Sequence, residues 1–308
     1  MKTVFITGAA GFLGRCVAGL FAGAGWRVVA VDNMAPGEAR FGPETLYHQM
    51  QLPSSRFGDL LQTHAPNALI HCAGRASVPL SMDDPASDFR DNTVLTFEVL
   101  DALRRFAPAC RFLFLSSAAV YGDPVALPVS ESHRPAPLSP YGFHKWQCEL
   151  VCEEFSRIYG LATASARIFS AYGPGLRRQV VWDICQRVLT TGQLALGGTG
   201  HESRDFIHAT DIARALLLIA EKAPMTGEVY NLATGREASI AEVAALILEA
   251  LGSQVQPQFS GRSRPGDPLH WRADISKIAA LGFAPAFSLE AGLRSVAQWA
   301  TADLARPA

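Results

Sequence analysis

The chain has 308 residues, of which 49% are hydrophobic and 18% are charged, and its formal net charge is −1. This composition is typical of a globular protein, and the near-neutral charge argues against nucleic acid or an acidic membrane surface as a partner. No apolar run approaches the roughly 20 residues of a membrane span, and the amino terminus carries no secretory signal, so we expect a soluble cytoplasmic protein.

Six cysteines are scattered through apolar surroundings without a paired framework. Cys148 and Cys152 have helical spacing but lack the additional His or Cys partners that a zinc site needs. We therefore expect buried, reduced thiols and no metal site.

The first predicted strand, Thr3–Thr7, leads directly into a glycine-rich turn and then into a helix. Gly8, Gly11 and Gly14 leave bare backbone N–H groups at the amino end of that helix, which is where a pyrophosphate binds. Their spacing is one residue longer than the common dinucleotide fingerprint, so a plain turn is the alternative for the triplet taken by itself.

The second predicted strand ends at Asp32. A carboxylate at that strand end is placed to accept hydrogen bonds from both ribose hydroxyls of an adenosine, and it would repel a 2′-phosphate. We therefore expect NAD rather than NADP as the cofactor. A solvated aspartate that merely ends the strand is the alternative.

Two further strands are predicted at residues 46–52 and 67–74, followed by a long helix at about residues 84–105. The small residues Ala73 and Gly74 would let a cofactor lie across the end of the fourth strand. Asn92 is a polar residue on an otherwise core-facing side of the helix, and we expect it to be solvated.

The stretch from Ser116 to Lys145 needs a chemical explanation. Ser116 and Ser117 close the apolar strand RFLFLSS, and a helix after Pro140 would place Tyr141 and Lys145 on one face. An ammonium beside a phenol favours the phenolate, and a nearby hydroxyl can bond a reacting oxygen, so these groups together make a proton-transfer site. Taken alone, the Tyr and Lys pair also fits a surface aromatic beside a solvated lysine.

One more strand is expected within residues 161–174, so strands alternate with helices throughout the first 170 residues. This alternation predicts an α/β fold with a Rossmann-type, doubly wound parallel sheet. A chain of 308 residues suits such a domain together with a smaller second lobe.

In the second half of the chain we expect a helix that begins at Thr210 or Asp211, a strand at residues 228–235, and an amphipathic helix capped by Ser239. Trp271 and Trp299 are expected to pack in the core rather than to serve as stacking platforms.

Eight short motifs occur along the chain in this order: TGAAGFLG, Asp32, HCAG, SSAAVYG, YGFHK, RIFSAYGPG, RDFIHATDIA and RPGD. Their order and spacing resemble the extended short-chain dehydrogenases/reductases, in particular the NAD-dependent nucleotide-sugar epimerase/dehydratase family, and within it the UDP-glucose 4-epimerase group. The resemblance covers residues 2–299 and implies an NAD-binding Rossmann domain at residues 1–170. It also implies a nucleotide-sugar-binding lobe, mainly residues 171–308, from which some segments return to the sheet.

For the cofactor, the resemblance adds Phe12 and Leu13 to the loop and Asn33 to the ribose contacts. Family members usually bind adenine through a Gly-Asp pair after the third strand, but Asp59 lies too close to the fourth strand for that role. We therefore expect Asp59 in a helix and Gln51 as the adenine contact. The expected cofactor contacts are Gly8, Gly11, Phe12, Leu13, Gly14, Asp32, Asn33, Gln51, Leu52, Ala73, Gly74, Tyr141 and Lys145.

For the reaction, the resemblance makes Tyr141 the catalytic base, Lys145 the partner that lowers its pKa and bonds the nicotinamide ribose, and Ser117 the hydroxyl that holds the sugar oxygen. Arg204 and Arg264 match arginines that grip the substrate diphosphate, a task suited to a guanidinium fork.

Ser170 stands where such epimerases usually have Asn, which leaves the nucleotide and the sugar open. The expected substrate contacts are Ser117, Ser170, Arg177, Gln179, Arg204 and Arg264. Arg178 is a further candidate in the same segment, and one or both of its two arginines could instead be solvated.

The 4,6-dehydratases of the family carry an acid pair directly after the catalytic hydroxyl, where this chain has Ala118 and Ala119. Without a carboxyl group to protonate a leaving hydroxide, dehydration is not expected. The resemblance therefore implies an NAD-dependent nucleotide-sugar 4-epimerase of the UDP-hexose type, which works through a transient 4-keto sugar. An NAD(P)H-dependent 4-keto sugar reductase is the alternative, and a non-catalytic nucleotide sensor or scaffold is a remote one.

The implied partners are a nucleotide-diphosphate sugar and a second copy of the chain. Relatives form homodimers through the two helices expected here at residues 84–105 and 141–158. The apolar residues assigned to their outer faces are Phe89, Leu95, Phe97, Leu150, Val151 and Phe155. A core role for these residues is the alternative.

Overall fold

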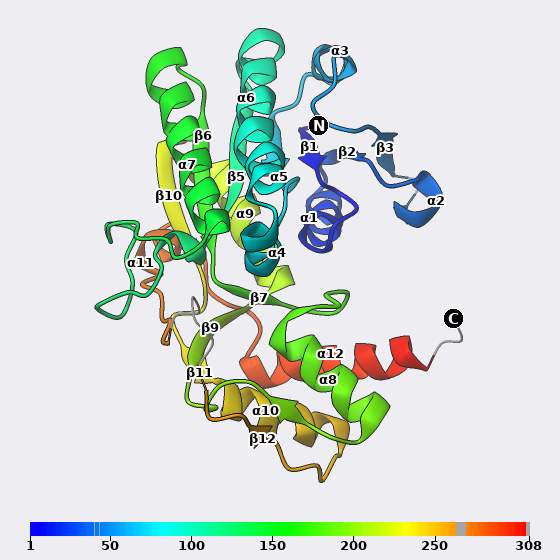
Figure 1. Ribbon diagram of the computed structural model, residues 1–308. Coiled ribbons are helices and arrows are strands. Elements are labelled where there is room, and N and C mark those ends of the chain that lie inside the picture. The colour runs from blue at the N-terminus through cyan, green and yellow to red at the C-terminus, as the bar shows by residue number, and fades with distance from the viewer. Residues whose placement is uncertain (40, 43, 263–268, 306–308) are drawn as a thin grey trace.

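The computed structural model describes residues 1–39, 41–42, 44–262 and 269–305. A large sheet domain stands above a smaller lobe built mainly from three helices, as Figure 1 shows. The lobe helices are α8 (Gln179–Thr191), α10 (Ile240–Leu251) and α12 (Leu289–Leu304).

The sheet domain contains a seven-stranded sheet in the order β10-β6-β5-β4-β1-β2-β3, and every pairing in it is parallel. The strands are β1 (Thr3–Thr7), β2 (Arg27–Asp32), β3 (Thr45–Gln49), β4 (Ala68–His71), β5 (Arg111–Ser117), β6 (Thr163–Ile168) and β10 (Thr226–Leu232). The central strands are buried on both faces, which explains why β1 and β5 read as nearly continuous apolar runs. The doubly wound parallel sheet predicted from the sequence is confirmed.

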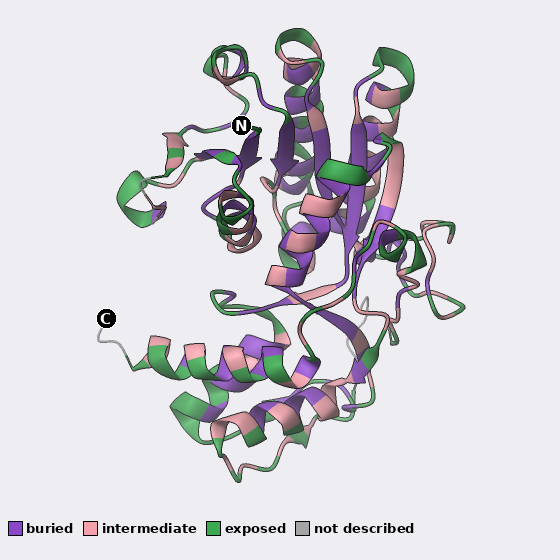
Figure 2. Ribbon diagram, turned by 180° about the vertical axis from the view of Figure 1, so that it is seen from behind, coloured by how far each residue is buried: buried purple, intermediate pink, exposed green. Residues whose placement is uncertain are grey.

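Helices cover both faces of this sheet. One face is covered by α1 (Phe12–Gly23) and α9 (Ala209–Lys222), and the other by α3 (Arg56–His64), α6 (Leu95–Phe106) and α7 (Pro140–Tyr159). Alternate residues of β1 contribute to the two cores, because successive side chains of a strand point to opposite faces. Figure 2 shows the buried residues gathered where helices and sheet meet.

Several elements of the sheet domain come from beyond residue 170. Strand β10 pairs with β6 at the sheet edge, and α9 packs its buried Ile212, Leu216 and Ile219 into the core on the α1 side. The short helix α11 (Ser276–Ala279) also returns, and its Ile278 is buried in the same core. The partly interleaved second lobe expected from the sequence is therefore confirmed.

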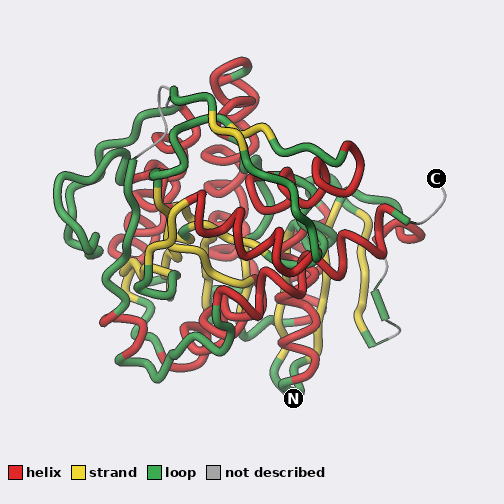
Figure 3. Tube along the Cα trace, turned by 90° about the horizontal axis from the view of Figure 1, so that it is seen from below, coloured by secondary structure: helices red, strands yellow, loops and turns green. Residues whose placement is uncertain are grey.

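The lobe has a core of its own, formed by side chains of its helices and of two small sheets. Figure 3 shows the helices and strands of the chain from below. The strands of the lobe are β7 (Ser170–Tyr172), β8 (Ala195–Leu196), β9 (Ser203–His208), β11 (Glu237–Ser239) and β12 (Gln258–Phe259). Trp299 packs beside Trp182 with ring centroids 5.1 Å apart, so the prediction that Trp299 is a packing residue is confirmed.

The long helix predicted at about residues 84–105 is present as a continuous helical run over residues 85–106 that contains a π turn. Its elements are α5 (Pro85–Phe89), the π-helical turn η1 (Arg90–Val94) and α6, preceded by α4 (Val78–Asp83). Asn92 lies in the π turn, is 1% exposed, and donates from Nδ2 to the Asp88 carbonyl at 3.0 Å. The prediction that Asn92 is solvated is wrong, because the residue lies on the core-facing side of the helix, in line with the buried Thr96 and Val99.

Other boundaries differ slightly from the prediction. Strand β3 ends at Gln49 rather than at residue 52, and α9 begins one residue before the predicted start. The cap of α9 is His208, whose Nδ1 accepts a hydrogen bond from the Thr210 N–H, while Asp211 accepts from backbone N–H groups near Phe287. Ser239 caps α10 as predicted. The remaining short helices are α2 (Pro36–Ala39) and the 3-10 turn η2 (Ala118–Val120).

Within the described ranges, none of the helices is both long and apolar enough to cross a bilayer. The same residues contain no group of three or more His, Cys, Asp or Glu side chains arranged to hold a metal ion. All six cysteines are unpaired, four of them buried and two partly buried.

Candidate active site

A cavity of about 770 Å³ lies between the carboxyl ends of the sheet strands and the lobe. The strand order reverses between β1 and β4, and ligands of open parallel sheets bind in the crevice outside such a reversal. On the sheet side the lining includes Gly8, Gly11, Phe12, Leu13, Gly14, Gly74, Ser117, Tyr141 and Lys145. On the lobe side it includes Ser170, Arg178, Gln179, Asp183, Arg187, Glu202, Arg204 and Trp271.

The glycine loop uses its glycines for two different reasons. Gly8 has φ of +65°, and a Cβ there would lie 2.5 Å from the Ala73 backbone nitrogen, so the packing of the chain requires glycine. At Gly11, a Cβ would have only the Gly8 oxygen within 4 Å, and no side chain caps α1 at this position. The amino end of α1 therefore presents uncapped N–H groups to the cavity, as a pyrophosphate requires.

Asp32 lies at the end of β2, beside the glycine loop. Its two carboxylate oxygens accept hydrogen bonds from the Ala10 N–H at 2.9 Å and the Met34 N–H at 3.0 Å. A carboxylate has about four acceptor positions, so this orientation leaves capacity for ribose hydroxyls. Asn33 donates to the Gln51 side chain at 3.0 Å, which brings the expected ribose and adenine contacts together. Leu52 is buried in the core below them.

Tyr141 and Lys145 lie on the first turns of α7 and are 8% and 5% exposed. Ser139 caps the helix by accepting from the Gly142 N–H at 3.2 Å, and Ser81 accepts from the Tyr141 N–H at 3.1 Å. Lys145 donates from Nζ to the Leu115 carbonyl at 3.1 Å and lies 5.8 Å from the centroid of the Tyr141 ring. The helical spacing read from the sequence does place the ammonium next to the phenol.

The two serines at the end of β5 have different partners. Ser116 donates from Oγ to Glu149 at 2.5 Å and is buried. Ser117 accepts from the Ala119 N–H at 3.1 Å, which leaves its hydroxyl hydrogen for a ligand in the cavity. Ser117 is therefore better placed than Ser116 for the expected role of holding the sugar oxygen.

Arg204 and Trp271 form part of the lobe side of the cavity. Arg204 donates from Nη1 to the Ser203 carbonyl at 2.8 Å, and its guanidinium lies 5.6 Å from the Trp271 ring centroid. Trp271 donates from Nε1 to the Gly122 carbonyl at 3.2 Å, so it is a cavity wall as well as a packing residue. Arg264, the second expected diphosphate arginine, lies outside the described residues.

The segment before α8 turns its two arginines in different directions. Arg177 pairs with Asp303 at 2.6 Å and does not line the cavity, contrary to the expectation that it contacts the substrate. Arg178 lines the cavity and donates to the Ala76 carbonyl on the sheet side. Gln179 also lines it, in a left-handed conformation with φ of +69°. Consecutive residues diverge here because the backbone is irregular, and residue types alone do not show this.

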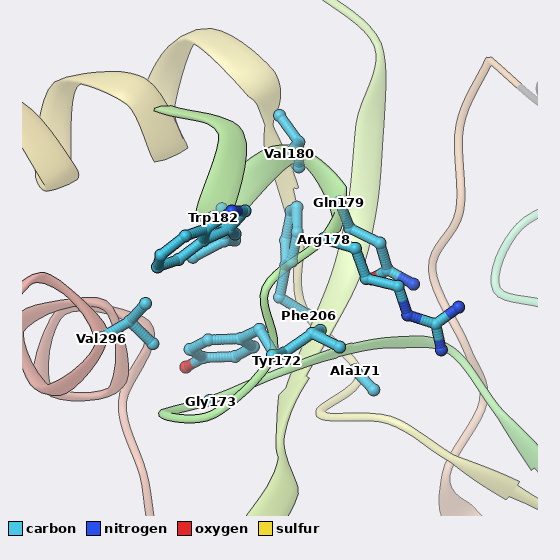
Figure 4. A pocket seen from close by; sticks show the side chains of 11 residues that line it. Ala171, Tyr172, Gly173, Arg178, Gln179, Val180, Trp182, Phe206 and Val296 are labelled. Carbon is cyan, nitrogen blue, oxygen red and sulfur yellow. The ribbon is translucent and has the colours of Figure 1, made fainter. Parts of the chain in front are cut away.

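Figure 4 shows Arg178 and Gln179 extending together away from the aromatic rings of Tyr172 and Trp182. The narrow pocket among those rings has a volume of only about 10 Å³, which is the space of one water molecule. The larger cavity, where Arg178 and Gln179 also lie, is therefore the candidate site.

Asn92 is a candidate cofactor contact that the sequence reading missed. Its Oδ1 is buried without a hydrogen-bond partner, and a Cβ at Gly74 would lie 2.7 Å from it. Gly74 lines the cavity and Asn92 does not, so this unpartnered acceptor lies directly behind the cavity wall. The signal in the sequence was a polar residue on the core-facing side of a helix, and its polar type made a solvated side chain the expected outcome.

These observations fit NAD. The uncapped amino end of α1 suits its pyrophosphate, the Asp32 carboxylate suits a ribose diol, and the Asn92 acceptor suits a donor at the inner end. Burial raises the pKa of the Cys72 thiol to about 12, which keeps this group in its protonated form at neutral pH.

A sequence model described as the NAD dependent epimerase/dehydratase family matches residues 4–233. The chain belongs to this family. It is an NAD-dependent enzyme, as the family description states. The glycine loop and Asp32 at the carboxyl end of the sheet fit that cofactor. A UDP-glucose 4-epimerase from Azospirillum brasilense is 30% identical over 319 residues, which cover 96% of this chain and 91% of the relative.

Two solved structures of epimerases are similar over almost their whole length. The UDP-glucose 4-epimerase of Thermotoga maritima with UDP-glucose has a TM-score of 0.90 at 29% identity and covers 98% of this chain and 100% of its own. The UDP-glucose 4-epimerase of Thermus thermophilus with NAD has a TM-score of 0.88 at 26% identity, and the match covers 97% of this chain and 99% of that structure's chain.

Relatives of this protein also include an enzyme that catalyses a reaction other than epimerisation. A UDP-glucuronic acid decarboxylase from Xenopus tropicalis is 28% identical over 313 residues, which cover 98% of this chain and 73% of the relative. Family membership therefore fixes the fold and the cofactor, and the reaction has to be argued from the residues of the cavity.

Proposed function

We propose that this protein is a UDP-hexose 4-epimerase, which oxidises the sugar at C4 to a ketone and reduces it again on the other face. The observation that carries the proposal is the group of Ser117, Tyr141 and Lys145 at the sheet end of a cavity large enough for cofactor and substrate. In support, the relatives reported above include UDP-glucose 4-epimerases similar along nearly the whole chain.

Each of the three residues has a separate task in this proposal. Tyr141 accepts the proton of the C4 hydroxyl at its phenol oxygen and returns it in the second half-reaction. The Lys145 ammonium stabilises the negative charge on that oxygen, and the Ser117 hydroxyl holds the reacting sugar oxygen by a hydrogen bond. NAD supplies the acceptor and donor for the hydrogen at C4, so no net oxidation results.

The substrate diphosphate would bind on the lobe side. Arg204 is held there by its contact with Trp271, and Arg178 adds a second guanidinium to the same cavity. Binding energy from the nucleotide would retain the keto intermediate while the sugar turns over. Arg264 belongs to the same proposal through the family resemblance, although it lies outside the described residues.

The distribution of carboxylates argues against dehydration. Ala118 is completely buried and Ala119 lines the cavity next to Ser117, so neither offers an acid to a leaving hydroxide. The acidic residues among the described lining are Asp183 and Glu202, which belong to the lobe.

We also propose a homodimer through α6 and α7. On these helices Phe97 and Leu150 are 44% and 48% exposed, and such apolar area on neighbouring helices fits an isologous contact. Leu95 and Phe155, which were assigned to the outer faces, are buried core residues instead.

The proposal also includes a domain boundary near residue 170, with the nucleotide-sugar-binding lobe mainly after it. We further propose that the protein is cytoplasmic. The six unpaired cysteines fit a reducing compartment.

The test is to incubate the purified protein, without added cofactor, with UDP-glucose, UDP-N-acetylglucosamine, UDP-glucuronate and their GDP, dTDP and CDP counterparts, and to follow products by NMR. We expect a C4 epimer of a UDP-hexose with no change in total NADH. Consumption of NADH with a 4-keto nucleotide sugar, and no epimer from any substrate, would instead identify a reductase. Release of carbon dioxide from UDP-glucuronate would identify a decarboxylase.

A further inference from the structure

A buried ion pair lies directly behind the reacting residues. Arg167 on β6 donates to Glu149 on α7 from Nη2 at 2.7 Å and from Nε at 3.0 Å, and both side chains are 5% exposed. Ser116 on β5 donates to the same carboxylate at 2.5 Å. One carboxylate on the helix is thus bonded to both neighbouring strands.

The pair is adjacent to the reacting groups on each element. Tyr141, Lys145 and Glu149 follow one another at intervals of four residues, so they lie along one face of α7, and all three are buried. On β5, Ser116 directly precedes Ser117. The bonds of Glu149 therefore fix the same helix and strand whose other residues would carry out the reaction.

Arg167 also contacts Tyr121, in addition to its bonds with Glu149. Its guanidinium lies 4.6 Å from the Tyr121 ring centroid, and the Tyr121 hydroxyl donates to Asn231 on β10 at 2.7 Å. Burial works to lower the pKa of Arg167, but the hydrogen bonds and charge of Glu149 raise it overall, so the guanidinium stays charged. The network therefore extends from α7 across three strands of the sheet.

Stability alone is a poor explanation for such a pair. Removing two charges from water costs about as much as their attraction returns, and replacing both partners by neutral residues often leaves stability unchanged or higher. A two-point guanidinium–carboxylate contact does, however, permit only one relative position of its elements. Apolar contacts between a helix and a sheet tolerate small displacements, and a misplacement of about 1 Å at a reaction centre can cost about 100-fold in rate.

We propose that Glu149 and Arg167 are positioning residues, which fix α7 against β5 so that Tyr141 and Lys145 meet Ser117 in the geometry that the reaction needs. This inference rests on the proposed function for its kinetic readout. Its second readout, the deuterium exchange of backbone amides in α7, does not depend on any activity.

The test is the double variant Glu149→Gln with Arg167→Met, which removes both charges and keeps an acceptor for Ser116. A single substitution would leave one charge buried without its partner and could unfold the protein. The matched control is Glu153→Gln with Arg157→Met, which removes an exposed ion pair at 2.9 Å on the same helix.

We expect the buried double variant to keep its thermal midpoint and NAD content, while kcat falls at least 10-fold and KM stays within twofold of the original. Backbone amides of residues 141–149 should exchange with deuterium at least 10-fold faster. The control variant should match the original protein in kcat and in exchange.

An unchanged kcat in the buried double variant would overturn the inference, even if the thermal midpoint fell, because the pair would then be purely structural. Should the original protein epimerise no substrate, the proposed function fails, and the exchange measurement decides the inference by itself. Faster exchange confined to the start of α7 would then support it, and unchanged exchange would overturn it.

Discussion

At the scale of single residues, Tyr141 and Lys145 show what side-chain chemistry is available in the cavity. The phenol of Tyr141 is the group that the proposal uses to take and return the proton of the sugar hydroxyl, and no other tyrosine is part of the described lining. Changing Tyr141 to Phe keeps the ring and removes the oxygen that exchanges the proton.

We expect Tyr141→Phe to lower kcat at least about 100-fold, which is the usual contribution of a positioned acid or base. Bound NAD should be retained, because the ring continues to fill its place. Epimerisation rate and NAD content of the purified variant are the measurements. The control is Tyr159→Phe, on the exposed end of the same helix, which should have the original rate. Near-normal turnover by the Tyr141 variant would remove the phenol from the mechanism.

His71 predicts a pH effect on stability. It is fully buried on β4, shares a hydrogen bond of 2.7 Å with Thr7, and its pKa is lowered to about 3 by burial and by the charge of Lys145. In the unfolded chain the pKa is the ordinary 6.5, so the unfolded state binds more protons than the folded state between these values. Stability from this residue is therefore full above pH 6.5 and decreases as the pH falls below it.

Between pH 7 and pH 5.5 the wild-type free energy of unfolding should fall by about 1 kcal/mol through this residue alone. The variant His71→Gln has no titrating ring, so its stability should change less across the same range. Urea unfolding of both proteins at the two pH values measures the difference. Equal pH dependence in the two proteins would show that His71 does not contribute.

At the scale of elements, the turn between β1 and α1 joins a structural requirement to a functional one. Gly8 has a left-handed backbone and no room for a Cβ against the Ala73 backbone, whereas Gly19 lies in the exposed part of α1 with nothing within 4 Å of a Cβ. The same substitution should therefore have opposite effects at two positions of one strand–helix unit.

Gly8→Ala should destabilise the protein by about 1–3 kcal/mol, because it adds a left-handed non-glycine residue and a steric clash. Gly19→Ala should be neutral or stabilise by up to about 1 kcal/mol, because alanine is the better helix former. Thermal unfolding of the two variants against the original protein measures both. A Gly8 variant as stable as the original would mean that the loop can move away from β4.

The helices and turns also explain which site residues could be predicted from the sequence. Tyr141 and Lys145 were predictable because a regular helix fixes the direction of residues four apart. The same rule put Asn92 on the core-facing side of its helix, and the expectation that it is solvated failed because that expectation rested on residue type alone. Arg177 and Arg178 could not be told apart, because the left-handed Gln179 beside them makes the directions of the side chains irregular.

At the scale of the whole molecule, alternation of strands and helices was enough to predict the doubly wound sheet. The position of Arg178 opposite Ala76 was not predictable, since it depends on how the lobe meets the sheet domain. Such contacts between distant segments have no local signature in a sequence.

The proposed dimer depends on exposed apolar surface over α6 and α7. Leu150→Glu would place charges symmetrically in an isologous contact, so we expect a monomer at micromolar concentration where the original protein is a dimer. Sedimentation velocity measures the change, with Leu46→Glu, an exposed leucine on β3, as the control. A monomeric original protein would disprove the dimer itself.

The return of α9 and β10 to the sheet domain has a consequence for how the chain is made. During synthesis, the first 170 residues leave the ribosome before the helix and strand that finish their sheet. Until residue 232 has emerged, the face that α9 will cover and the open edge of β6 are exposed to other nascent chains. The amino-terminal half therefore reaches a protected state only when the later segment arrives, and a fragment that stops near residue 170 should be recovered as aggregate.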